Sequence, residues 1–297
     1  MNILNCSIMI DSDELLVSSS IDDDELLLEN YLLESFDSGS PKLKTIRKIN
    51  LSHNSLSITP NITHLIYLRE LHLAYNNLTN VECLSEINYV LDVLDLSNNR
   101  ISKINNPLKS LNIKLDNNKL TEFTICEFNE TISANNNQIY RVHSLKFNVN
   151  NNFMLKELYL KNNLIRYIDW IICFISLEKL VLSQNSIIQT NPLNKLINLY
   201  YLDLNYNLIK TLIIIDLSNL IILKLKDNFI NSVNILQCLK KLNYLNLDGN
   251  YKCPVDKLQF IDLLIFNRFR VNIDYGDFCL VDLWGQELSE FEIIMDE

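Results

Sequence analysis

One short pattern recurs ten times along the 297-residue chain. In it, two apolar residues separated by one other residue are followed by an asparagine and then by another apolar residue. The third copy, for example, reads Leu94-Asp-Leu-Ser-Asn-Asn99-Arg-Ile. Successive asparagines are separated by 22, 23, 19, 19, 26, 22, 22, 21 and 22 residues. Such a period is the signature of a solenoid, in which neighbouring repeats bury a shared core. The asparagines are Asn54, Asn76, Asn99, Asn118, Asn137, Asn163, Asn185, Asn207, Asn228 and Asn250.

The spacing of the two apolar residues predicts a short extended segment in every repeat, because residues two apart in a strand point to the same face. Stacked repeats would form a parallel sheet on the inner wall of the solenoid. Where the chain leaves each strand, backbone N–H and C=O groups lose their partners. A buried primary amide can satisfy both kinds of group, since it has two donors and an acceptor. We therefore expect the asparagines to form a structural ladder between coils.

The repeats are not uniform. Ala134 takes a leucine position in the phrase Thr131-Ile-Ser-Ala-Asn-Asn-Asn137, and the two intervals of 19 residues predict short, nearly straight outer segments. The interval of 26 residues contains an insertion at 147–153, which predicts a loop on the outer or flank side. Elsewhere apolar residues follow the strand at steps of about three, which favours a helical or 3₁₀ outer wall.

The pattern matches the leucine-rich-repeat signature L-x-x-L-x-L-x-x-N-x-L over residues 43–250, and the chain resembles that superfamily. The resemblance implies an α/β fold: a right-handed, horseshoe-shaped solenoid of about ten repeats, with a parallel concave sheet and an irregular, 3₁₀ or helical convex side. The 19-residue coils and the phrase from Glu130 to Val142 look like the insect leucine-rich-repeat immune proteins and a gene family of insect poxviruses. The resemblance to the insect immune proteins implies a role in binding a complement-like partner.

We expect a cap at each end of the repeats, since an open solenoid end exposes core. Residues 1–42 form an acidic N-terminal cap, predicted to hold a strand or two and a helix around 23–35. Residues 251–297 form a C-terminal cap and an acidic tail. The resemblance to extracellular leucine-rich-repeat caps implies a disulfide between Cys253 and Cys279. No leader sequence is evident, which favours the cytoplasm, whereas the cap cysteines suggest secretion, so the localisation stays open.

Charge is segregated along the chain. Ten acids and no base lie in residues 1–40, and six acids and no base lie in 280–297, which leaves 20 acids and 26 basic residues between them. An acidic chain without a basic stripe is a poor candidate for nucleic acid or for an anionic membrane surface. No apolar run reaches transmembrane length.

No residue set points to catalysis, a cofactor or a metal. The four histidines include His53 and His72 on adjacent coils, where we expect two surface histidines rather than metal ligands. No glycine-rich phosphate loop, nucleophile elbow or zinc motif occurs. Of the seven cysteines, Cys126 lies on a core position of its repeat, and none forms a C-x-x-C motif. The sequence therefore predicts a protein that is not an enzyme.

A scaffold with a long concave wall suggests protein binding instead. Outward positions of the second to fifth coils are small and polar, whereas those of the sixth to tenth carry tyrosines and aliphatic residues bordered by lysines. This composition is typical of an interface centre, although exposed tyrosines also simply suit a parallel sheet. The lysines favour an acidic partner segment, and the chain's own termini are one candidate. The residues are Tyr159, Val181, Tyr201, Tyr206, Ile222, Tyr244, Lys161, Lys179, Lys224 and Lys226.

Two functions remain open from the sequence. The first is a non-catalytic protein-binding module, immune-related or a viral modulator of host proteins. The alternative is an intracellular regulatory subunit or scaffold that resembles phosphatase-regulating leucine-rich-repeat proteins. Uniform 22-residue spacing would support the alternative, and the 19-residue coils count against it. The sequence identifies neither the partner nor the oligomeric state.

Overall fold

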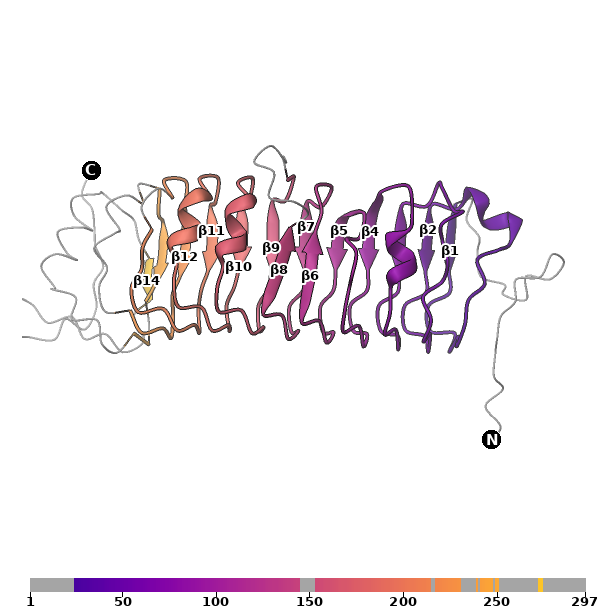
Figure 1. Cartoon of the computed structure of the whole chain (residues 1–297), viewed down its shortest axis with the longest axis horizontal. Coiled ribbons are helices and arrows are strands. Elements are labelled where there is room, and N and C mark those ends of the chain that lie inside the picture. The colour runs from indigo at the N-terminus through magenta and orange to yellow at the C-terminus, as the bar shows by residue number, and fades with distance from the viewer. Residues whose placement is uncertain are drawn as a thin grey trace, which may run out of the picture.

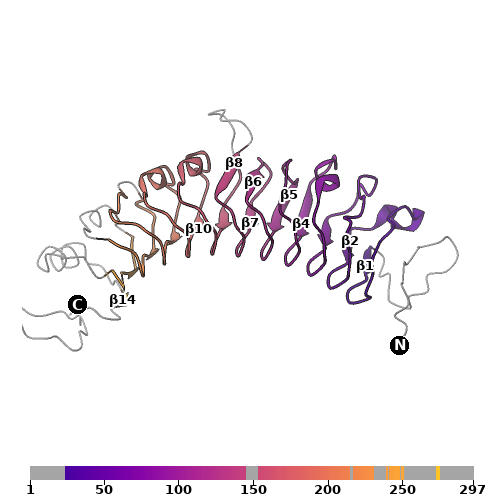
Figure 2. The ribbon, with the colours of Figure 1, turned by 60° about the horizontal axis from the view of Figure 1, so that its bottom comes forward.

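The computed structural model shows a curved solenoid with one long parallel sheet along its inner side (Figures 1 and 2). It describes residues 24–144, 153–214, 217–230, 239, 241–247, 249–250 and the backbone of 272–274. The sheet has twelve strands in the order β1-β2-β3-β4-β5-β7-β9-β10-β11-β12-β13-β14, and every neighbouring pair is parallel. The predicted fold is thus confirmed.

The strands are short. Those of the long sheet are β1 (Glu25–Leu27), β2 (Lys48–Asn50), β3 (Glu70–His72), β4 (Leu91–Asp95), β5 (Ser110–Lys114), β7 (Thr131–Ser133), β9 (Glu157–Tyr159), β10 (Lys179–Val181), β11 (Tyr201–Asp203), β12 (Ile222–Lys224), β13 (Tyr244–Asn246) and β14 (Asn272–Asp274). Ten of them, β2 to β5, β7 and β9 to β13, come from the ten copies of the sequence pattern, one strand from each.

The described part of the N-terminal cap differs from the prediction of a helix around 23–35. Residues 25–27 form strand β1, which pairs with β2 so that Leu26 faces Ile49 in register. Leu26, Leu28 and Leu33 are buried, at the spacing of a further repeat. The helix prediction is wrong because the three consecutive leucines 26–28 alternate as in a strand. Leu26 and Leu28 face the core, whereas Leu27 points outward and is 37% exposed.

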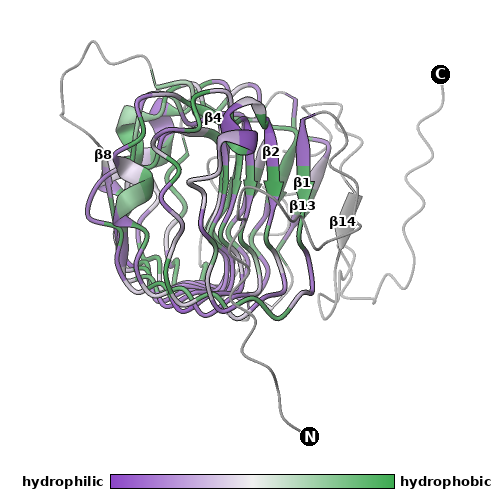
Figure 3. Ribbon diagram, turned by 90° about the vertical axis from the view of Figure 1, so that its right-hand side faces the viewer, coloured by the Kyte–Doolittle hydropathy of each residue, from purple (hydrophilic) through white to green (hydrophobic). Residues whose placement is uncertain are grey.

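The outer wall is built mainly from turns and four 3₁₀ segments, as the three-residue apolar steps predict. These are η1 (Pro41–Thr45), η2 (Glu82–Ser85), η3 (Asp169–Cys173) and η4 (Asn191–Lys195). Viewed end on, the outer segments lie opposite the sheet, with the core between them (Figure 3). Within the described ranges no segment is an α-helix.

The outer segments of the fourth and fifth coils are straight, as predicted. Only the first of them lies within a 19-residue interval (118–137), whereas the second lies within the interval of 26 residues (137–163). They form a second, two-stranded parallel sheet of β6 (Glu122–Ile125) and β8 (Arg141–Ser144) on the convex side. An extended segment spans the outer wall directly, without the residues that a 3₁₀ turn takes up. The predicted insertion loop at 147–153 lies outside the described residues except for Phe153, whose side chain is buried.

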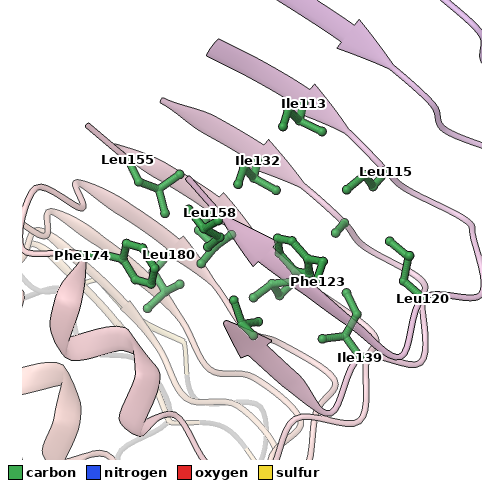
Figure 4. Close-up of a cluster of buried hydrophobic side chains, with 14 of the residues drawn as sticks. Ile113, Leu115, Leu120, Phe123, Ile132, Ile139, Leu155, Leu158, Phe174 and Leu180 are labelled. Atoms are coloured by element: carbon green, nitrogen blue, oxygen red, sulfur yellow. The ribbon is translucent and has the colours of Figure 1, made fainter. Parts of the chain in front are cut away.

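The core is a continuous column of aliphatic side chains from the strands and the outer wall (Figure 4). Ala134 lies in this column and is fully buried, as its place in the repeat predicts. The ring of Phe123, from β6, points into the same column from the outer side. Cys126 is also buried, and burial raises the pKa of its thiol. Cys253 and Cys279 lie outside the described residues.

The ten repeat asparagines share one hydrogen-bonding scheme. Asn163 is typical: its Oδ1 accepts the backbone N–H of Ile139 at 2.9 Å, and its Nδ2 donates to the carbonyls of Ala134 at 3.0 Å and Leu160 at 3.1 Å. Each amide therefore joins its own coil to the preceding one. The same bonds recur at Asn54, Asn76, Asn99, Asn118, Asn137, Asn185, Asn207, Asn228 and Asn250.

Candidate protein-binding face

The strand register arranges the concave side chains in rows that run across the coils. On strands β9 to β12 the residues before and after the inner apolar residue face outward, as the alternating burial of each strand shows. One row contains Glu157, Lys179, Tyr201, Ile222 and Tyr244, and the next contains Tyr159, Val181, Asp203 and Lys224. Residues that are 21 or 22 positions apart in sequence thus become neighbours on this face.

Tyrosine rings and lysine ammonium groups alternate from β9 to β12, and their contacts cross between the two rows. The Nζ atom of Lys179 lies 5.0 Å from the ring centroid of Tyr159 and 5.2 Å from that of Tyr201. The Nζ atom of Lys224 lies 5.3 Å from the same Tyr201 ring. These distances are those of cation–π contacts. The pKa of Lys179 is raised chiefly by a hydrogen bond with Tyr159, and that of Lys224 by one with Tyr201.

The lysines of the N-terminal half of the face have different partners. Lys48 lies between Glu25 and Glu70, at 3.5 Å and 3.9 Å, and Lys114 pairs with Asp95 at 3.5 Å. Lys179 and Lys224, by contrast, form no ion pair within 4.0 Å with any residue that the structure describes. Their ammonium groups are held by aromatic rings, which leaves positive charge available for a bound anion.

The remaining predicted residues take different places around this cluster. Val181 lies beside Tyr159, and Ile222 and Tyr244 continue the row of Tyr201 toward the C-terminus. Lys161 and Lys226 follow their strands, and their backbone N–H groups donate to the side chains of asparagines on the preceding coil. Tyr206 is separate from the cluster: it lies past the end of β11, at a φ of 56°.

Two carboxylates within the face were missed by the sequence analysis. Glu157 accepts a hydrogen bond from the hydroxyl of Tyr159 at 2.5 Å, and the carboxylate of Asp203 accepts the backbone N–H of Asn205 at 3.0 Å. Burial raises the pKa of Asp203, while the Asn205 N–H and Lys224 oppose the shift. Their place on the face could have been predicted from the sequence, because both residues occupy outward positions of the repeat.

We expect Asp203→Asn to remove an unfavourable buried charge while keeping the acceptor for Asn205. Because folding raises this pKa above 3.8, the folded state binds the proton more tightly than the unfolded state does. The carboxylate therefore opposes folding at neutral pH, and this effect fades as the pH falls through the raised pKa. The variant should match or exceed the wild type in urea unfolding at neutral pH and lose the advantage in acid. A clear loss of stability at neutral pH would show that attraction to Lys224 outweighs burial.

The histidines occupy surface positions, and the two on adjacent coils do not face each other. His53 stacks on Tyr75 with ring centroids 4.2 Å apart, whereas Nε2 of His72 lies 3.2 Å from Glu70. Within the described ranges no group of three histidines, cysteines or carboxylates could hold a metal ion. Nor does any helix found there have the length and apolarity needed to cross a membrane.

Comparison with known proteins supports the same architecture. The leucine-rich-repeat family model matches residues 90–111, and no curated protein sequence matches the chain. A chain of the LRIM1/APL1C complex is 24% identical with a TM-score of 0.61, covering 70% of this chain and 40% of that one. The leucine-rich-repeat domain of APL1B is 24% identical with a TM-score of 0.60, covering 70% and 63%. A leucine-rich-repeat protein from Bacteroides eggerthii is 17% identical with a TM-score of 0.63, covering 82% and 46%.

APL1 and LRIM1 are insect immune proteins, so the resemblance seen in the sequence extends to the structure. The chain spans less than two thirds of the length of each of these three structures. At such identities the likeness concerns the fold. The repeated asparagine pattern, the strand register and these comparisons together show a leucine-rich-repeat solenoid fold and a resemblance to that superfamily.

Proposed function

We propose that the chain is a non-catalytic protein-binding module whose partner docks on the C-terminal half of the concave face. The observation that carries this proposal is the alternation of Tyr159, Lys179, Tyr201 and Lys224 across four coils. Both tyrosines are half-buried, and tyrosines held in place by neighbouring cations are typical of the central contacts of an interface, since they bring large area at a low entropy cost.

The partner surface that fits this face is acidic. Lys48 and Lys114 in the N-terminal half are already paired with carboxylates, whereas Lys179 and Lys224 lie against tyrosine rings and form no ion pair within 4.0 Å with a described residue. Lys161 and Lys226 lie one row further on and add to the positive charge. A partner carboxylate could therefore pair with either ammonium without breaking an existing ion pair. Such complementarity chiefly speeds association and makes it sensitive to salt.

The setting of this binding is part of the proposal. The likeness to the insect immune proteins favours an immune-related role, or that of a viral modulator that binds a host protein. The intracellular regulatory subunit is the alternative, and it gains no support from the straight outer strands β6 and β8. A count of free thiols in protein from native cells separates the two, because a protected pair of cysteines indicates an oxidising compartment.

Photo-crosslinking tests the location of the face. A benzophenone amino acid placed at Tyr201 should capture the partner in cells, whereas the same group at Val93 should not. Val93 is a matched control, because it occupies the same row of the sheet on β4. Mass spectrometry of the crosslinked product then identifies the partner and the peptide that contacts Tyr201. Capture through Val93 and not through Tyr201 would place the binding face in the other half.

We expect Tyr201→Ala and Lys224→Ala each to weaken binding of that partner at least tenfold, measured by surface plasmon resonance with purified proteins. The tyrosine is the central ring of the cluster, and the lysine supplies charge beside it. Lys48→Ala is the control, since its ammonium is already neutralised by two glutamates. Melting temperatures should stay near that of the wild type. Unchanged affinity in both variants would refute the proposal.

A further inference from the structure

A further row of side chains, distinct from the two rows of the tyrosine–lysine cluster, runs along the edge of the concave face. It consists of the residue just before each repeat asparagine, and we call its members from the first to the eighth coil the edge stripe. All eight have φ between 55° and 57°. The edge stripe is His53, Tyr75, Asn98, Asn117, Asn136, Asn162, Gln184 and Tyr206.

The middle of the edge stripe is a ladder of side-chain amides. Nδ2 of Asn117 donates to Oδ1 of Asn98 at 2.9 Å, Asn136 donates to Asn117 at 2.8 Å, and Asn162 donates to Asn136 at 3.0 Å. These bonds lie at the surface, unlike those of the buried repeat asparagines. They fix the four amides in one orientation on four successive coils.

Each inner amide keeps hydrogen-bonding capacity that the ladder does not use. A primary amide has two N–H donors and two acceptor lone pairs. Asn117 and Asn136 each spend one donor and one acceptor on their ladder neighbours. What remains is one donor and one acceptor per coil, side by side and exposed. A hydroxyl group suits this pair, because it donates and accepts at the same atom.

Aromatic rings lie at the two ends of the amide ladder. At the N-terminal end His53 and Tyr75 are stacked, with an interplanar angle of 12°, and Tyr75 is 52% exposed. At the C-terminal end, after Gln184, comes Tyr206, which is 46% exposed. Exposed aromatic faces beside fixed amides are the two kinds of group that bind the apolar faces and the hydroxyls of a sugar ring.

The left-handed backbone conformation does not by itself explain these residues. Asparagine tolerates a positive φ, and glycine, which occupies the same position at Gly249, has no steric cost there. Histidine, like asparagine, is enriched in this conformation, whereas the bulkier tyrosine is disfavoured. Tyr75 and Tyr206 therefore occupy positions that the turn geometry alone would assign to glycine or asparagine.

We propose that the edge stripe binds a neutral, extended β-linked polysaccharide that runs across the coils. Parallel strands repeat at about 4.8 Å, close to the ring-to-ring repeat of about 5 Å in such a glycan. An extended peptide fits less well, because its side chains on one face repeat at about 6.8 Å. The stripe itself carries no carboxylate or ammonium group, which favours a neutral ligand.

Titration calorimetry with cellohexaose and chitohexaose tests this assignment. We expect the full chain to bind at least one of these neutral hexasaccharides, with an affinity that is little affected by salt. Asn117→Gly combined with Asn136→Gly should weaken binding at least tenfold. Glycine is the replacement of choice, because it removes the amide while retaining the left-handed backbone. Asp227→Gly, at the same position of the ninth coil and outside the stripe, is the matched control and should leave binding unchanged.

The result also separates this site from the protein-binding face. Tyr201→Ala should reduce partner capture and leave glycan binding intact, and the double glycine variant should do the reverse. Binding of neither neutral hexasaccharide would overturn the inference. So would binding confined to a sulfated hexasaccharide from heparin, or neutral binding that survives the double glycine variant undiminished.

Discussion

Replacing Phe174 with alanine should lower the free energy of unfolding by about 3–5 kcal/mol, the usual cost of removing a buried aromatic ring. Phe174 is fully buried directly after η3. Its ring meets Phe153 edge to face at 4.9 Å and lies 6.3 Å from Trp170. Neighbouring coils are already packed against one another through their strands, so we expect them to collapse only partly into the space left behind.

Urea unfolding followed by circular dichroism measures the effect, and Ile175→Ala provides the control. Ile175 is the next residue in sequence and 55% exposed, so its truncation should change stability by less than about 0.5 kcal/mol. Because each coil contacts only its neighbours, the loss of hydrogen-exchange protection should be greatest around coils five to seven. If Phe174→Ala and Ile175→Ala proved equally mild, the sixth coil could not contain a tightly packed core.

The interior of the repeats could be predicted from the sequence because it depends on local spacing. Two apolar residues separated by one other residue, with an asparagine three residues later, determine the strand and its turn independently of the rest of the sequence. The N-terminal strand β1 was missed because its coil has Tyr31 where the other coils have asparagine. Its turn is bonded from the next coil instead, since Oδ1 of Asn54 accepts the N–H groups of both Tyr31 and Leu33.

The candidate face was only partly predictable, for a different reason. The sequence shows which residues face outward, but contacts between coils depend on register and on rotamers. The placement of Lys179 between Tyr159 and Tyr201 follows from offsets of 20 and 22 residues, which no local pattern reveals. Tyr206 was grouped with the strand tyrosines, although its turn places it at the edge. The amide ladder from Asn98 to Asn162 escaped notice because asparagine is common throughout the chain.

Asn163→Ala should cost about 1–3 kcal/mol, because it leaves buried backbone groups without partners. The N–H of Ile139 and the carbonyls of Ala134 and Leu160 all bond to this one amide. Asn163→Asp is the sharper test: a carboxylate can still accept from Ile139 but cannot donate to either carbonyl. We expect the aspartate variant to be at least as unstable as the alanine variant near neutral pH. The alanine change at Asn137, which is less buried than Asn163, should cost less. A wild-type urea midpoint for Asn163→Asp would mean that the amide's donors do not hold the coils together.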